Sequence, residues 1–349
     1  NKMNYVAYAA SQAGFEIKII SPSWSSNSKG FYKGRENKIF ENVTLKIGPT
    51  FGAKNFITRK LRILFSWLWL FFFLIKNIEK NEKIIVYHSM MAIYPILFAQ
   101  KIKKFKIILE FNEIYQDVSS FSKSFRNLEM KIIRSAHSYI LSSELLQQKI
   151  NTEKKFIINY GDYRVSSFET NFDSEKIHIV YAGIIDRVKG AFNAIECAKF
   201  LNEKYIIHII GFGNNNDIIK LKESIALNNK ESKCQVIYDG IKTGQDYIKY
   251  ISKCNIGLST QSNEAKFNNT SFPSKIMSYL SMGLRVVSVD IPALKSSQIS
   301  NLLYYYKDNT SKSIAETILK IDFNLNYDSK RALIDLHNNF IFNVKKILK

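Results

Sequence analysis

Short apolar runs alternate with segments of helical periodicity along almost the whole chain. Runs such as Ile17–Ser21 and Ile256–Ser259 have the length and the branched side chains of buried strands. Segments such as Ser124–Ser135 instead repeat apolar residues every three or four positions. Strands and helices that take turns in this way predict parallel sheets built from β-α-β units.

The alternation forms two series of similar size on either side of a polar stretch at 165–175. The expected strands are Ile17–Ser21, Ile84–Tyr87, Lys106–Glu110, Ser138–Ser142, Lys155–Ile158, Ile177–Ala182, Ile206–Ile210, Gln235–Tyr238, Ile256–Ser259 and Arg285–Ser288. The expected helices include a first one closed by Ala13-Gly14 and then Ser124–Ser135, Ala191–Leu201, Asn216–Asn228, Gly244–Ser252, Pro273–Met282 and Ser329–Leu348.

Two series of this kind predict an α/β chain with two Rossmann-like, doubly wound domains. We expect a first domain at 1–168, a second at 169–325 and a closing helical segment at 326–349. A fold of alternating strands rarely opens on a helix, so we also expect a further strand before Asn1 in the native protein.

Composition excludes several classes. Hydrophobic residues make up 46% of the chain and charged residues 23%, which is ordinary for a folded protein and not for a disordered one. Three scattered cysteines do not make a disulfide framework and are typical of a reducing, cytoplasmic compartment. The five histidines have no metal-binding spacing, so we expect no metal site and no cofactor.

The charge is strongly basic and uneven. The net charge is +20; residues 1–150 carry 23 basic and 10 acidic side chains, and residues 151–349 carry 27 and 20. A basic first half predicts an anionic partner, which could be a lipid surface, a phosphorylated substrate or nucleic acid. The basic residues are scattered among apolar segments and accompany no known nucleic-acid signature, which argues against the last.

The most apolar run is Ile63–Ile75, which is shorter than the roughly 20 residues needed to cross a bilayer. It is bounded by Arg59, Lys60 and Arg62 before it and by Lys76 and Lys80 after it. One interpretation is a helix buried in the core. The other is a helix lying in a membrane interface, with Trp67 and Trp69 at the depth of the lipid headgroups.

Three motifs of the second series carry candidate chemistry. The first, Gly183 to Gly190, follows a strand, leads into a helix and contains Arg187 and Lys189. A glycine at a strand end allows close approach of a ligand, and a helix N-terminus with two cations suits a diphosphate. The second, Gly211-Phe212-Gly213, is a common turn after a strand that could also border a nucleobase.

The third motif runs from Asn269 to Ser288. A loop with Thr270 and Ser271 enters a helix that has Pro273 in its first turn and ends at Gly283. Thr270, Ser271, Ser274 and Lys275 are therefore expected at a helix N-terminus, where phosphate oxygens could bind. All three motifs fall at carboxyl ends of strands, the edge at which open α/β sheets bind ligands.

The order G-x(3)-R-x-K-G, I-x-G-x-G and F-P-S-K-x(3)-Y-L-x-x-G-x-x-V-V-S resembles the C-terminal domain of GT-B glycosyltransferases of the family 4 type. In the first half, S-Q-A-G-F-E-I-K-I-I-S-P resembles the start of the acceptor domain, and V-Y-H-S and E-F-N-E-I-Y-Q-D-V resemble its later strand ends. The resemblance is closest to bacterial enzymes of surface-polysaccharide assembly.

This resemblance implies two domains facing a cleft and a final helix that crosses back to the first domain. It implies a retaining, metal-independent transferase that uses a nucleotide-diphosphate sugar, with UDP-sugars favoured. Arg187 and Lys189 match the cations that neutralise the donor diphosphate. The donor-binding residues it implies are Gly183, Arg187, Lys189, Gly211, Gly213, Thr270, Ser271, Ser274, Lys275 and Ser278, with contacts near Gly211 and Ile241 selecting the base.

One departure concerns two glutamates that the family often carries eight positions apart. Alignment on Gly283 places them at Thr270 and Ser278, so both are absent, and Glu264 is out of register. The contacts of these glutamates with the donor must be made differently, or the chain is inactive. The non-catalytic alternative is a nucleotide-sugar-binding scaffold of the same pathway. A nucleotide-sugar epimerase is a further alternative, although the second half shows no convincing catalytic set for one.

In the first half, His88, Glu110 and Glu113 lie at expected strand ends. His88 and Glu113 are candidate catalytic residues and all three are candidate acceptor-side residues, although each could instead order a loop. The acceptor implied by the resemblance is a glycan or a lipid-linked saccharide. Together with the basic first half, this predicts a peripheral protein on the inner face of the plasma membrane, bound to anionic lipid and not to nucleic acid.

Overall fold

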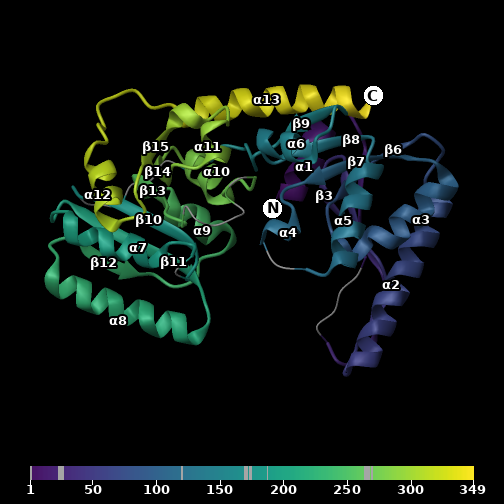
Figure 1. The fold of residues 1–349 in the computed structure, drawn as a ribbon, viewed down its shortest axis with the longest axis horizontal. Helices are drawn as coiled ribbons and strands as arrows, with labels where there is room; N and C mark the ends of the chain where they lie inside the picture. Colours follow the sequence, from purple (N-terminus) through teal and green to yellow (C-terminus); the bar gives the residue numbers. More distant parts are fainter. Residues whose placement is uncertain are drawn as a thin grey trace. The chain divides into compact units, whose positions relative to one another are not determined.

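The two series of strands fold into two units. The computed structural model describes residues 2–22, 27–118, 121–168, 172, 175–186, 188–262, 268 and 270–349. Unit 1 comprises Asn1–Leu141, Ile150–Asn159 and Asn338–Lys349, and unit 2 comprises Ser142–Lys149 and Tyr160–His337. The boundary expected at 168/169 therefore falls inside unit 2. Figure 1 labels the helices and strands of both units.

Unit 2 contains one sheet of six parallel strands. They are β10 (Ile177–Ile184), β11 (Tyr205–Phe212), β12 (Gln235–Tyr238), β13 (Ile256–Ser259), β14 (Arg285–Val289) and β15 (Leu303–Tyr306). Their order across the sheet is β12-β11-β10-β13-β14-β15, which is 3-2-1-4-5-6 in chain order. This is the doubly wound Rossmann order, and its direction reverses between β10 and β13, the place where such sheets bind ligands.

Helices connect these strands. They are α7 (Ala191–Glu196), α8 (Asn215–Glu231), α9 (Gly244–Ile251), α10 (Ser274–Ser281), α11 (Pro292–Lys295) and α12 (Ser311–Leu319), and α6 (Glu144–Ile150) lies almost wholly in unit 2. A 3-10 turn, Cys197–Phe200, continues α7. Helix α7 packs on both α8 and α12, and α10 packs on β13 and β14. Gly283 follows the end of α10 with a φ of +84°, as expected for its predicted capping role.

Unit 1 has three smaller sheets. Its strands are β1 (Ile17–Ser21), β2 (Phe31–Tyr32), β3 (Arg35–Phe40), β4 (Val43–Ile47), β5 (Thr50–Phe51), β6 (Lys83–Tyr87), β7 (Lys106–Phe111), β8 (Ser138–Leu141) and β9 (Phe156–Ile158). The sheet β6-β7-β8-β9 is parallel throughout. In β1-β4-β3 the first pair is parallel and the second antiparallel, and β2 pairs with β5.

The helices of unit 1 are α1 (Lys2–Gln12), α2 (Phe56–Asn77), α3 (Ile93–Lys103), α4 (Tyr115–Val118) and α5 (Lys123–Ser135). Helix α2 begins at a capping box in which Asn55 and Thr58 exchange hydrogen bonds. The tail helix α13 spans Ser329–Leu348, as predicted, and its residues belong to unit 2 up to His337 and to unit 1 beyond it. Among the described residues, no helix combines the length and the apolarity needed to cross a membrane.

A chain of buried polar side chains crosses β10 and β11. His178 Nδ1 lies 2.9 Å from His208 Nε2, and His208 Nδ1 lies 3.0 Å from Asp239 Oδ2 and 2.7 Å from the Tyr250 hydroxyl. Phe172 stacks on both imidazole rings. The arrangement is satisfied with both histidines neutral, each donating one N–H toward Asp239 along the chain.

We expect this chain to make the protein sensitive to acid. Burial, with smaller contributions from His208 and Lys176, lowers the pKa of His178 from 6.5 to about 4. The unfolded chain therefore binds a proton that the folded chain excludes, and folding should lose about 2 kcal/mol between about pH 7.5 and about pH 5. Denaturant titrations at both pH values would measure this loss. His178→Gln should show a smaller loss, and equal acid sensitivity of both proteins would contradict the assignment.

Candidate functional site

The point where the unit 2 sheet reverses direction is held by one tyrosine. The paired register of β10 and β13 ends at Tyr181 and Leu258. There the backbone N–H of Ala182 donates to the Tyr279 hydroxyl at 2.8 Å, and that hydroxyl donates to the Leu258 carbonyl at 3.3 Å. A side chain on Gly257 would come within 2.4 Å of the Tyr279 ring, so glycine allows the ring to lie against β13. Tyr279 therefore fixes α10 against the diverging strands.

The turn from Gly183 to Gly190, after β10, is closed by its own hydrogen bonds. The hydroxyl of the buried Tyr181 lies 2.8 Å from the Ile184 carbonyl oxygen and 3.0 Å from that of Lys189, so its one proton is shared between two acceptors. Asp186 accepts a hydrogen bond from the backbone N–H of Lys189. These contacts give the turn a defined shape with Lys189 at the entrance to α7. Arg187, the other predicted cation, lies outside the described residues.

Gly190 joins this turn to the end of β13. Thr260 Oγ1 donates to the Gly190 carbonyl at 2.8 Å, and a β-carbon on Gly190 would lie 1.7 Å from the Thr260 carbonyl oxygen. The φ of Gly190 is also positive, at +86°. The glycine is thus required both by the close approach and by the backbone conformation.

Lys275, from the first turn of α10, lies beside the same turn. Its Nζ lies 4.0 Å from the centroid of the Tyr181 ring and 3.2 Å from where a β-carbon on Gly183 would stand. Burial, followed by repulsion from Lys189, lowers the pKa of Lys275 to about 7, and Asp186 opposes this shift. The structure thus brings three predicted site residues together: Gly183, Lys189 and Lys275. Two lysines close enough to repel each other form a site that an anion would stabilise.

Close backbone packing explains why glycine is required at positions 211 and 213, without any ligand. A β-carbon on Gly211 would lie 1.8 Å from the Gly183 carbonyl oxygen, and one on Gly213 would lie 2.7 Å from that of Ile185. The two glycines let the ends of β10 and β11 run close together. The prediction that Gly211 and Gly213 contact a donor is not tested, and any such contact would be made by their backbone groups.

Three large apolar side chains remain exposed at this edge of the sheet. Ile184 ends β10, Phe212 ends β11, and Ile241 follows β12, the next strand across the sheet. They are 44%, 56% and 62% exposed. Ile184 and Phe212 are opposite each other in the paired register of β10 and β11, so these two side chains are neighbours.

The other predicted residues of the motif from Asn269 to Ser288 lie near the start of α10 or within it. Thr270 is buried, and its carbonyl accepts a hydrogen bond from Ser143 Oγ at 2.7 Å. Ser271 is half-buried and Ser274 is exposed. Ser278 hydrogen-bonds the hydroxyl of Tyr247. The positions of the family glutamates therefore hold a buried threonine and a serine with a partner in α9, and Glu264 lies outside the described residues.

In unit 1, His88 follows β6 and is enclosed by aromatic rings. Its imidazole stacks on Tyr115 with centroids 4.7 Å apart, meets Phe111 edge-on and is only 3% exposed. Its Nε2 lies 3.6 Å from Glu129 Oε1, which accepts the Tyr115 backbone N–H at 2.8 Å. Burial lowers the pKa of His88 to about 4 and raises that of Glu129. Contact between His88 and a substrate stays a prediction that requires Tyr115 to move.

Glu110 and Glu113 lie in and just after β7. Glu110 is buried, and burial raises its pKa to about 7, with the charge of Lys2 opposing the shift. Glu113 is half-buried. Burial raises the pKa of Tyr87 and Tyr115, and the charge of Glu113 adds a smaller contribution to both shifts. His88 and these carboxyls thus lie at the ends of neighbouring strands. Sequence reasoning missed Glu129 and Tyr115, because a glutamate in an amphipathic helix carries no signal of burial.

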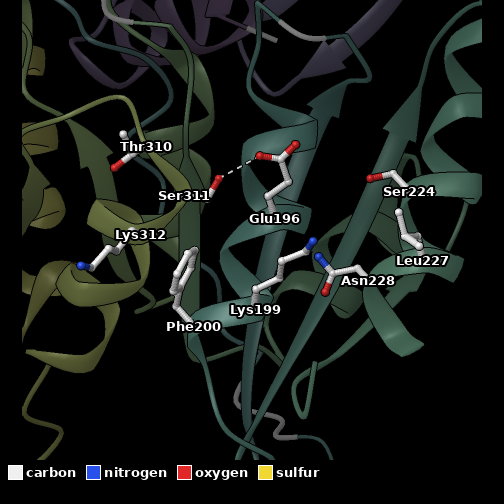
Figure 2. Close-up of a pocket in the computed structure, with 9 residues that line it drawn as sticks. All are labelled: Glu196, Lys199, Phe200, Ser224, Leu227, Asn228, Thr310, Ser311 and Lys312. Carbon is white, nitrogen blue, oxygen red and sulfur yellow. Dashed lines mark hydrogen bonds between the residues drawn. The ribbon is translucent and has the colours of Figure 1, made fainter. Parts of the chain in front are cut away.

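A hollow elsewhere in unit 2 contains none of the predicted residues. It has a volume of about 390 Å³ and is shown in Figure 2. The residues that line it are Glu196, Lys199, Phe200, Ser224, Leu227, Asn228, Thr310, Ser311 and Lys312. Its charged groups Glu196 and Lys199 already have partners: Glu196 accepts a hydrogen bond from Ser311, and Lys199 forms an ion pair with Glu231. Among the residues that the structure describes, no cluster of His, Cys, Asp or Glu could hold a metal ion.

No protein-family model matches the sequence, and no curated protein matches it. Solved structures do match the fold. Trehalose-6-phosphate synthase from E. coli, bound with UDP-2-fluoro glucose, superposes with a TM-score of 0.71 at 9% identity over 99% of this chain and 94% of that one. Anabaena HepE, in complex with UDP and glucose, gives 0.59 at 12% identity over 88% and 82%.

A third example is an α,α-trehalose-phosphate synthase (UDP-forming) from Burkholderia xenovorans in complex with glucose-6-phosphate. It gives a TM-score of 0.63 at 10% identity over 98% of this chain and 93% of that one. At such low identity these matches show the fold. The chain has the α/β GT-B fold, and the predicted fold class is confirmed.

The junction at Gly190 can be tested without any ligand. Gly190→Ala should destabilise unit 2 by more than about 2 kcal/mol, because it adds a backbone clash to the strain of a positive φ. Gly240→Ala is the matched control, since Gly240 has a φ of +72° and nothing within 4 Å of the added carbon. It should cost only about 1 kcal/mol. Equal losses in denaturant titrations would show that the contact with Thr260 does not matter.

Proposed function

We propose that this chain is a glycosyltransferase that moves a sugar from a nucleoside diphosphate donor, with UDP-sugars favoured, to a saccharide acceptor. The observation that carries the proposal is the position of Lys275 against Tyr181 and Gly183, beside the turn that contains Lys189, where the unit 2 sheet reverses direction. The shared GT-B fold supports it, as does the presence of UDP or a UDP-sugar in structures of that fold.

The chemistry fits these cations. Transfer breaks the bond between the sugar C1 and the diphosphate oxygen and joins C1 to an acceptor hydroxyl oxygen. The proton of that hydroxyl passes to the departing diphosphate, which leaves as the free nucleoside diphosphate. Negative charge grows on the leaving diphosphate, so cations fixed beside it stabilise the transition state more than the ground state. Lys189 and Lys275 would do this together with Arg187, in place of the divalent metal used by transferases with acidic motifs.

The surroundings of the lysines suit the rest of the donor. Free N–H groups in the first turn of α10 and the hydroxyls of Ser271 and Ser274 would hydrogen-bond the phosphates and the sugar. The exposed ring of Phe212, with Ile184 and Ile241, would stack on the nucleobase. Thr270 is buried and would contribute only through its backbone.

On the acceptor side, we propose that His88, Glu110 and Glu113 orient a hydroxyl of a glycan or lipid-linked saccharide. Retention of configuration, metal independence and a place in bacterial surface-polysaccharide assembly follow from the family resemblance. The basic first half of the chain, with 23 basic and 10 acidic residues in 1–150, supports work at an anionic membrane face.

A second candidate is a protein that binds a nucleotide-sugar without turning it over. The observation that favours it is the replacement of both family glutamates by Thr270 and Ser278, with Ser278 bonded to Tyr247. Release of UDP from a UDP-sugar in the presence of acceptor saccharides separates the two candidates.

We expect a UDP-sugar to raise the melting temperature of the protein in the presence of EDTA. Saturation a hundredfold above Kd should add about 2.7 kcal/mol of stability. Lys189→Ala and Lys275→Ala should each weaken binding about ten- to hundredfold, because each removes a charge-assisted contact with the diphosphate. A thermal-shift titration with UDP-sugars and GDP-sugars measures both effects and identifies the base.

Lys312→Ala is the matched control, because Lys312 lines the hollow in Figure 2 and should leave binding unchanged. Loss of binding in Lys312→Ala alone would move the donor site to that hollow. Melting temperatures without ligand show whether each variant is folded.

Donor binding should also be linked to protonation. With its pKa at about 7, Lys275 is mostly neutral near pH 8 and mostly charged near pH 6. A UDP-sugar, whose diphosphate has no proton with a pKa near 7, should bind more tightly as the pH falls and should take up a proton near pH 7.5. Calorimetry in two buffers of different ionisation enthalpy measures that uptake. Lys275→Ala should abolish it, and uptake that survives in this variant would assign it to another group.

A further inference from the structure

Helix α2 turns an apolar face toward solvent. Its exposed face contains Ile57, Leu61, Leu64, Leu68 and Phe72, which are three or four residues apart and 48% to 67% exposed. Its buried residues are Arg62, Ser66, Leu70 and Leu74. Half-buried apolar residues such as Phe65, Trp69 and Phe73 line its packed side as well. The helix is therefore apolar on both sides, whereas a surface helix of a soluble domain turns polar residues outward. The solvent side of α2 is therefore a surface in need of a partner.

Helix α3 continues this face. Tyr94, Phe98 and Ile102 are spaced by four residues and are 42%, 58% and 62% exposed. The two helices pack side by side, as Figure 1 shows. They are joined by Trp67, whose Nε1 donates to the Met91 carbonyl and whose ring lies 5.1 Å from that of Tyr94. These exposed residues of α2 and α3, with Met91, form one area that we call the α2–α3 surface.

Trp67 and Trp69 pack within unit 1, whereas one interpretation of the sequence placed them at the depth of the lipid headgroups. Trp69 packs so closely on Gly48 that a β-carbon there would lie 2.6 Å from the ring. Trp67 links α2 to α3 and is half-buried. The side chains that stand free are therefore leucines, isoleucines, tyrosine and phenylalanines.

Most charges around the α2–α3 surface are basic, and the exposed carboxylates near it are Glu79 and Glu82, which follow the end of α2. Residues 42–78 contain six basic residues and no acidic one, and residues 83–109 contain five basic residues and no acidic one. The exposed cations of these segments include Lys54, Arg59, Lys60, Lys76, Lys101 and Lys104. Cations bordering a wide apolar face match a bilayer interface with anionic headgroups. Nucleic acid would use the cations but not the apolar side chains.

We propose that the α2–α3 surface docks into the plane of an anionic lipid bilayer. The apolar side chains of both helices enter the boundary between headgroups and acyl chains, and the bordering cations contact the lipid phosphates. This inference deepens the proposed function by naming the surface through which the protein reaches its substrate. It rests on that function only for the identity of a lipid-linked acceptor.

Flotation with vesicles tests the surface. The protein should float with vesicles of phosphatidylcholine and phosphatidylglycerol in equal parts, and much less with phosphatidylcholine alone or at high salt. The triple variant Leu64→Ser, Leu68→Ser, Phe98→Ser should bind the anionic vesicles at least about tenfold more weakly, because three apolar side chains no longer enter the interface. The pair Lys60→Glu, Lys101→Glu should also bind more weakly and lose most of the salt dependence.

The matched control is Ile219→Ser, Leu227→Ser on α8, two exposed apolar residues of unit 2 that should leave flotation unchanged. Failure of the native protein to float, or flotation of the triple variant at the native level, would overturn the proposal. A native dimer that the triple variant converts to a monomer would also overturn it and assign the surface to a second copy of the chain.

The same samples separate this inference from the proposed function. The triple variant should keep the melting-temperature rise given by a UDP-sugar, since its substitutions are on exposed positions of unit 1. Flotation without any response to nucleotide-sugars would leave the docking surface standing and remove the donor site.

Discussion

The candidate site depends on a single hydroxyl group placed between two strands. By accepting from Ala182 and donating to Leu258, Tyr279 completes the hydrogen bonding of β10 and β13 where they stop pairing with each other. Because Lys275 lies one helical turn before Tyr279 on α10, the same contact also sets the position of Lys275 Nζ over the Tyr181 ring. A polar group buried at this point would be costly if it were unpaired, so the geometry of the strands, the helix and the lysine is fixed together.

The lysine site and the histidine site show two uses of burial. At Lys275, burial and the neighbouring Lys189 lower the pKa and so disfavour the charged form. At His88, the aromatic enclosure and the nearby Glu129 hold a neutral ring in one orientation. The first arrangement responds to charge, whereas the second resists it, which is consistent with one site for a diphosphate and another for an uncharged hydroxyl.

The strands of unit 2 were predictable from the sequence. A parallel sheet covered by helices is buried on both faces, so its strands are continuous apolar runs. Strands β12 and β13 accordingly have the expected bounds. Strands β2 and β5 were missed because each has only two residues. Strand β3 was missed because four of its six residues, Arg35 to Lys38, are exposed and polar. Helix α3 was missed because apolar residues occur on all of its sides, so its sequence has no amphipathic periodicity. Lys189 and Lys275 could be predicted as site residues from their motifs. The sequence does not predict that the Tyr279 hydroxyl bridges β10 and β13, because a tyrosine on a helix is usually a core residue. Likewise, a pattern of apolar residues in α2 cannot tell which face the core leaves uncovered.

The contact between Gly257 and the Tyr279 ring has a consequence for how this protein can change over evolutionary time. Any side chain at 257 would displace the ring, whose atoms lie 2.4 Å from where a β-carbon would stand. Without the ring, a small residue at 279 leaves a void that an enlarged residue 257 could fill, yet the strands lose their bridging hydroxyl. The dependence therefore runs one way: a side chain at 257 requires a smaller residue at 279, whereas a change at 279 creates no clash with Gly257. Divergent copies of this chain are expected to change position 279 before position 257 or together with it.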